Sequence, residues 1–229
     1  MGPRRKTALV AGMLYLLTFV SIPSPFLLYD QVRNNREYIL GPGPDTAVFV
    51  GGILEIIVAL AGIGTAVALY PVLKGQNETA ALGLVGSRVL EAAGILAGVA
   101  CLLAIVSLRQ AGAGTGALVA GQMLAILYGR IFLLSQSLLP IVNDLLLGFL
   151  LYRSRLVPRV LPLIGLIGGP LLAVSDLGVL FNVWGQTSSV AGLLALPVAI
   201  FEFALGVYLT VKGFQPSPIL AGDIREMPE

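Results

Sequence analysis

Hydrophobic stretches recur along almost the whole chain and are separated by short polar breaks. A helix that crosses a membrane needs about 20 mostly apolar residues. Five stretches clearly meet this requirement, at residues 7–28, 47–73, 82–108, 157–183 and 190–211. Because apolar positions surround each predicted helix instead of forming one stripe, the pattern indicates helices that face lipid and one another.

One further apolar stretch, residues 117–152, does not fit a single crossing. Its roughly 36 residues would form a helix of about 54 Å at 1.5 Å per residue, whereas the hydrocarbon core of a bilayer is roughly 30 Å thick. The stretch contains either two short crossings or one crossing over residues 136–152 that follows a helix which does not cross. These alternatives predict seven and six spans.

Basic residues favour the six-span alternative, because cytoplasmic loops carry an excess of Lys and Arg. With a single crossing, most basic residues lie on the cytoplasmic side: Arg4, Arg5, Lys6, Lys74, Arg88, Arg153, Arg155, Arg159, Lys212 and Arg225. A double crossing would instead place four of these residues outside: Arg153, Arg155, Arg159 and Lys212. We therefore expect an all-α integral membrane bundle of six transmembrane helices plus one outer-leaflet or re-entrant helix over residues 117–135. Both termini are then cytoplasmic, in a cell membrane.

Segments outside the spans are short. Residues 29–46 contain the turn-forming sequence Gly41-Pro42-Gly43-Pro44-Asp45, which predicts a surface loop and no helix. Residues 1–216 are expected to form a single transmembrane domain, and residues 217–229 a mobile tail.

Composition narrows the class of protein further. Hydrophobic residues make up 57% of the 229 positions and charged residues 11%, against roughly 25% charged in a typical soluble domain. With a net charge of +2, the chain is neither a soluble domain nor a nucleic-acid-binding protein. It has no histidine, and Cys101 is its one cysteine. Imidazole bases, disulfides and the common metal sites are therefore absent, and we expect no catalytic residue, metal or cofactor.

Acidic residues inside the predicted spans are the candidate functional groups. An isolated charge near the bilayer centre costs at least about 2.5 kcal/mol, so each acid must be sheltered from lipid. Each shares a helical face with glycine or alanine, as Glu55 does with Ala59 and Gly62. Small residues mark the contacts between membrane helices. The acids are therefore expected to point into the bundle: Glu55, Glu91, Asp144, Asp176 and Glu202.

Arg88 and Arg130 are the cations available to these five acids. Arg88 is expected to pair with Glu91, three residues away, or with Glu202. The six-span topology places a second group in the outer half of the bundle: Glu55, Arg130, Asn143, Asp144 and Asp176. Two arginines cannot balance five carboxylates, so the remaining acids need protons, water or a cation. An outward-facing cavity lined by the second group is one interpretation, and simple ion pairing or a continuous ion path are the alternatives.

Several motifs resemble those of a known family. They include Gly86-Ser87-Arg88-Val89-Leu90-Glu91-Ala92, Leu151-Tyr152-Arg153-Ser154, Leu156-Val157-Pro158-Arg159 and Val211-Lys212-Gly213-Phe214. On these the chain resembles the bacterial multi-pass membrane proteins catalogued as domain of unknown function 4386. The resemblance implies six to seven spans and no established activity. Similar proteins tend to have an acidic or aromatic residue where this chain has Arg130.

Three functions are compatible with these observations. The first is binding or transport of a small polar or cationic ligand in an interior acidic cavity. The second is a non-catalytic subunit that contacts another membrane protein. An intramembrane enzyme acting on lipids is the weakest, because the sequence shows no pairing of a nucleophile with a base.

Overall fold

The structure is a computed structural model that describes residues 1–21, 27–41, 43 and 45–217. Within these residues the chain is helical and contains no strand, which confirms the all-α prediction. The elements are α1 (Pro3–Ser21), α3 (Asp30–Asn34), α4 (Asp45–Leu73), α5 (Glu78–Gln110), the 3₁₀ turn η1 (Gly114–Ala117), α6 (Leu118–Phe132), the π-helical segment η2 (Leu133–Leu138), α7 (Leu139–Ser154), α8 (Val160–Leu180) and α9 (Ser189–Val211).

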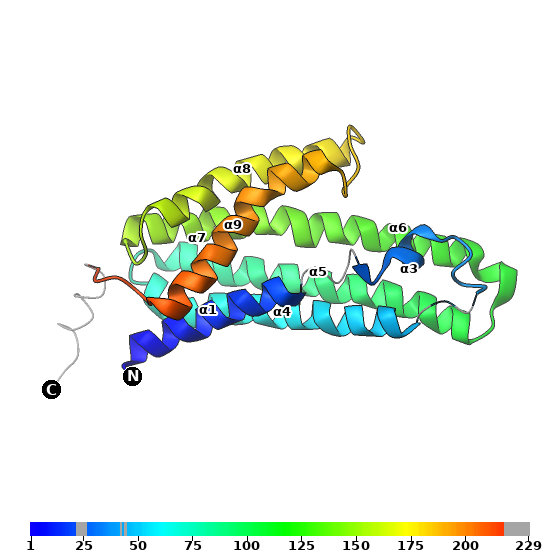
Figure 1. Ribbon diagram of the computed structural model, residues 1–229, viewed down its shortest axis with the longest axis horizontal. Helices are drawn as coiled ribbons and strands as arrows, with labels where there is room; N and C mark the ends of the chain where they lie inside the picture. The colour runs from blue at the N-terminus through cyan, green and yellow to red at the C-terminus, as the bar shows by residue number, and fades with distance from the viewer. Residues whose placement is uncertain (22–26, 42, 44, 218–229) are drawn as a thin grey trace.

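The long helices pack as a ring. Successive contacts join α1 to α4, α4 to α5, α5 to α6 and α7, α7 to α8, α8 to α9, and α9 back to α1. Figure 1 shows α4, α5 and the α6–α7 run lying alongside one another, with α8 above them and α9 slanting from α8 down to α1. The ring therefore has a middle, and this is where the buried polar residues gather.

Five helical segments are long and apolar enough to cross a membrane: Asp45–Leu73, Glu78–Gln110, Gly114–Ser154, Val160–Leu180 and Ser189–Val211. Four of them coincide with predicted spans, and Gly114–Ser154 contains the predicted span 136–152. The first predicted span, 7–28, is represented by the 19 residues of α1, whose first turn carries Arg4, Arg5 and Lys6; residues 22–26 lie outside the described residues. The fold is that of a multi-helix membrane protein.

The ambiguous stretch forms one uninterrupted helical run. Gly114–Ser154 covers 41 residues, or about 61 Å at the α-helical rise, and does not reverse direction. The expected division between residues 135 and 136 falls inside η2. The helix widens there because Pro140 has no N–H to donate to the carbonyl four residues earlier. The separate outer-leaflet or re-entrant helix over 117–135 is not confirmed.

The segment before α4, expected to be an ordered or semi-ordered surface loop, is partly helical. The loop prediction is wrong for Asp30–Asn34, which form the short helix α3. Tyr29, Val32 and Tyr38 are buried and pack against α5 and α6, and this apolar burial supports the turn of helix. An ion pair between Arg109 and Asp45 fixes the end of the segment.

The two ends of the described chain lie together (Figure 1). Arg5 donates from Nη1 to the carbonyl of Leu209 (2.8 Å) and from Nη2 to that of Thr210 (2.7 Å). After α9, Gln215 donates its N–H to the Leu156 carbonyl (2.8 Å) and Ser217 donates its hydroxyl to the Ser154 carbonyl. Ser217 is thus attached to the bundle, although it was assigned to the mobile tail. The rest of that tail, 218–229, lies outside the described residues.

Candidate functional site

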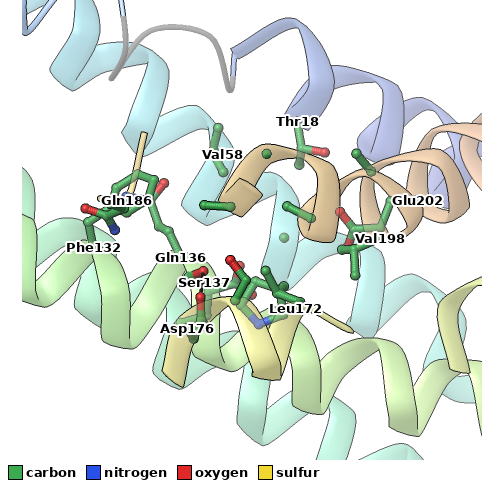
Figure 2. Close-up of a pocket in the computed structure, with 18 of the residues that line it drawn as sticks. Thr18, Val58, Phe132, Gln136, Ser137, Leu172, Asp176, Gln186, Val198 and Glu202 are labelled. Carbon is green, nitrogen blue, oxygen red and sulfur yellow. Dashed lines mark hydrogen bonds between the residues drawn. The ribbon is translucent and has the colours of Figure 1, made fainter. Parts of the chain in front are cut away.

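A partly open cavity of about 450 Å³ lies among the helices of the ring. Its walls come from α1, α4, α5, the α6–α7 run with η2, α8 and α9, and residues 186–188 border it between α8 and α9. Figure 2 shows Val58, Phe132, Leu172 and Val198 around it, together with the polar side chains of Gln136, Asp176 and Glu202. Most of the wall is apolar, and its few charged residues lie at the two ends of the cavity.

Arg88 organises the charged group at the deep end of the cavity. Its Nη1 donates to Oε2 of Glu91 (3.0 Å), and its Nη2 donates to Oε1 of Glu202 (2.5 Å). The guanidinium also lies over the ring of Tyr15, 5.8 Å from its centroid. All four side chains are buried. Both pairings predicted as alternatives for Arg88 therefore exist together.

Asn143 and Asp144 belong to this deep group and not to the outer group in which they were predicted. Asn143 donates from Nδ2 to Oε2 of Glu91 (2.7 Å). Asp144 is fully buried, and neither of its carboxyl oxygens has a hydrogen-bond partner. The reason is depth: Asp144 lies ten residues before the end of α7 and Arg88 ten residues after the start of α5. Each is thus about 15 Å from the same end of the bundle.

Asp176 marks the other end of the cavity. It is 7% exposed, accepts a hydrogen bond at Oδ1 from the hydroxyl of Ser137 (2.5 Å), and leaves Oδ2 without a partner. Ser137 and the neighbouring Gln136 come from the π-helical segment and both line the cavity. Figure 2 shows Ser137 beside Asp176. Asp176 is therefore a buried acid on the wall of the cavity.

Glu55 has a different role from the one predicted. Its carboxylate accepts three hydrogen bonds, from the hydroxyls of Tyr29 (3.1 Å) and Tyr128 (3.0 Å) and from Nε2 of Gln136 (2.8 Å). Glu55 is 1% exposed and is not among the residues lining the cavity. It attaches the segment before α4 to α6 and holds Gln136 in place, so it is an internal anchor and not a wall of the cavity.

Arg130, predicted to pair with an outer acid, is exposed on α6. No ion pair joins it to an acid in the described part of the chain. Tyr128, two residues earlier, is the α6 residue that reaches Glu55. Sequence reasoning did not find Tyr128, Tyr29 or Tyr15, because tyrosines in such chains ordinarily lie at the membrane interface. Only their contacts show that they serve the buried charges.

The charged residues lining the cavity are unbalanced. They are Arg88, Glu91, Asp176 and Glu202, one cation against three carboxyl groups. Gly165 of α8, eleven positions before Asp176, lies against Phe201 of α9. Asp176 and Glu202 are therefore about 17 Å apart along the bundle. In the described residues no group of three or more His, Cys, Asp or Glu is placed to hold a metal ion.

The fold and this cavity define a multi-span membrane protein with a mostly apolar interior chamber that has acidic groups at both ends. The chain belongs to the family described as Domain of unknown function (DUF4386), which matches residues 10–213. No curated protein and no solved structure matches the chain.

Proposed function

We propose that this protein binds a small organic cation in its interior cavity and carries it across the membrane. The observation that supports the proposal is Asp176, a buried acid with a free carboxyl oxygen on the cavity wall. A buried acceptor without a donor is costly, and an ammonium group supplies both the donors and the balancing charge.

The shape and lining of the cavity favour an organic cation over a bare metal ion. A volume of about 450 Å³ falls in the range of sites that hold small organic molecules. Tyr15, Phe19 and Phe132 add aromatic surface to the wall. Aromatic rings attract ammonium groups through the ring face, and the apolar wall accommodates hydrocarbon. Asp176 at one end of the cavity and Glu91 and Glu202 at the other supply two successive binding positions for the ammonium group. Two such positions suit a cation that moves through the bundle.

We further propose six crossings, by α1, α4, α5, the α6–α7 run, α8 and α9, with both termini cytoplasmic. The direction of the chain alternates between these elements, and their basic residues are unequally distributed. Arg4, Arg5, Lys6, Lys74, Arg153, Arg155, Arg159 and Lys212 lie at the end where α1 begins, whereas Arg33, Arg36 and Arg109 lie at the other. The positive-inside rule then assigns the first end to the cytoplasm.

Binding is tested with the purified full chain in detergent. The probes are benzylamine, choline and putrescine, with benzoate as an anion of the same size as benzylamine. We expect at least one amine to raise the melting temperature of the wild type, and benzoate to have no effect. In Asp176→Asn the amine affinity measured by calorimetry should fall about tenfold, because a charge-assisted hydrogen bond is lost. Glu37→Gln, at an exposed acid, is the matched control.

Two results would contradict the binding proposal: no response to any amine, or equal affinity in Asp176→Asn and wild type. Topology is tested separately, in cells, with single cysteines in a Cys101→Ser background. A membrane-impermeant maleimide should label Thr115→Cys and leave Gln76→Cys and Arg153→Cys unlabelled until the cells are opened. Labelling of Arg153→Cys in intact cells would favour seven spans.

A further inference from the structure

A second set of cavities lies along α6, and one of them borders the interior cavity at Val179 and Gln186. One, of about 370 Å³, lies between α6 and the segment that contains α3; the other, of about 300 Å³, lies between α6 and the turn that follows α8. Ile126 and Gly129 line both. The two cavities therefore adjoin along α6, and together we call them the α6 groove.

The α6 groove is basic. Arg33 and Arg36 line its first half and Arg130 its second, and no Asp or Glu is among the described residues that line either half. Gln122 adds an amide one helical turn before Ile126, and Arg130 follows one turn after it, so the three share a face of α6. Arg33 is held in place over the ring of Tyr128, 5.7 Å from its centroid. An anion in the groove would meet several fixed donors.

The floor and border of the α6 groove are apolar and exposed. Ile126, which lines both halves, is 65% exposed, and Leu134 and Leu138, on the turns that follow Arg130, are 58% and 43% exposed. Trp184 lines the second half, and tryptophan is typical of the boundary between lipid headgroups and hydrocarbon. A ligand of the groove therefore needs an anionic group and an adjoining hydrocarbon part.

We propose that the α6 groove binds the phosphate headgroup of an anionic membrane lipid. Arginine guanidinium groups bind phosphate oxygens through paired hydrogen bonds, and the acyl chains would run inward from Arg130 over Leu134 and Leu138. The proposal does not require the cation proposed for the interior cavity, although the two sites adjoin at Val179 and Gln186. It also gives Arg130, which has no acidic partner in the described residues, a charge to bind.

The test uses the purified full chain in detergent micelles containing increasing fractions of phosphatidylglycerol or of phosphatidylcholine. The double variant Arg36→Gln with Arg130→Gln changes two exposed side chains and leaves the contact of Arg33 with Tyr128 intact. We expect phosphatidylglycerol to raise the wild-type melting temperature more than phosphatidylcholine does. The fraction needed for half of this rise should increase about 30-fold in the double variant.

The control is Lys74→Gln with Arg153→Gln, which removes two exposed positive charges at the opposite end of the bundle. It should respond to phosphatidylglycerol as the wild type does. If the control lost the response to phosphatidylglycerol as strongly as the Arg36 and Arg130 variant does, the effect would be one of general surface charge, and the proposed site would be overturned. An unchanged response in the Arg36 and Arg130 variant would also overturn it. If inorganic phosphate at matched ionic strength gave the same rise, the ligand would be a free anion and not a lipid.

Discussion

Arg88 and Glu202 are 114 positions apart in the sequence, and their side chains meet across the middle of the ring. Arg88 belongs to α5 and Glu202 to α9, two helices that are not neighbours in the ring of contacts. Because α5 and α9 do not pack directly against each other, their ion pair closes the deep end of the cavity. Stability and the shape of the cavity depend on the same contact.

Replacing Arg88 should destabilise the protein strongly. Arg88→Met leaves Glu91 and Glu202 buried without their cation, and breaking a buried pair in this way costs about 3–5 kcal/mol. Thermal unfolding in detergent measures the loss. The double variant Arg88→Met with Glu202→Leu removes one orphaned carboxylate and should recover part of it. Additive losses in the double variant would show that the two residues do not interact.

Replacing Asp144 should have the opposite effect. Its oxygens have no donors, so the carboxyl contributes a desolvation cost that no hydrogen bond offsets. Asp144→Asn keeps the shape and adds an N–H₂ beside the acids of the deep group, and we expect a gain of about 1 kcal/mol in unfolding free energy. Asp30→Asn, at an exposed acid, should change stability by less than about 0.5 kcal/mol. A lower melting temperature for Asp144→Asn would refute this account.

Glu55 and its tyrosines should affect stability but not binding. Tyr128→Phe removes one of three donors to Glu55 and should cost about 1–3 kcal/mol, as expected for a buried acceptor that loses a partner. Because Glu55 does not line the cavity, amine affinity measured by calorimetry should stay the same. The control for stability is Tyr152→Phe, because the hydroxyl of Tyr152 makes no hydrogen bond to the described residues.

The contact of α1 with α9 depends on Gly12. A Cβ at this position would lie 2.5 Å from Oγ1 of Thr210 and 2.8 Å from the carbonyl oxygen of Gly206. Gly12→Ala should therefore separate the two helices and lower the unfolding free energy by about 1–3 kcal/mol. At Gly86, by contrast, a Cβ meets nothing within 4 Å. Gly86→Ala should be neutral or stabilising by up to about 1 kcal/mol, since alanine favours helix.

Tyr38 should make stability fall at high pH. Burial and the hydrogen bond from its hydroxyl to Asp45 raise the pKa of Tyr38 to about 12. Because the folded state retains this proton more tightly than the unfolded state, the contribution is complete below about pH 10 and is lost as the pH rises through 12. The difference in melting temperature between wild type and Tyr38→Phe, measured from pH 9 upward, should shrink above pH 10. A constant difference would contradict the shift.

The predicted spans agree with the helices to within a few residues where apolar runs end at charged or polar breaks. Residues 82–108, for example, lie inside Glu78–Gln110. The partners of the buried groups could not be predicted in the same way. Asp144 was assigned to the outer group because the start of its span was uncertain, and the continuous α6–α7 run sets its actual depth. Tyr128 reaches Glu55 from α6. The rotation of α6 about its axis is set by its packing on α5 and cannot be predicted from the local sequence.

Helix length differs between the two sides of the ring, and lipids should respond to this difference. α8 and α9 have 21 and 23 residues, close to the roughly 30 Å of a hydrocarbon core, whereas α5 has 33 and the α6–α7 run is longer still. A flat bilayer cannot match both sides, so the long side must tilt or the lipids beside it must stretch, at a cost of a fraction of a kcal/mol per Å. The protein therefore imposes a gradient of thickness on the surrounding membrane. The thickness of the surrounding bilayer should therefore influence where in a membrane the protein lies. It should also influence which membrane proteins pack against the long side and which against the short side.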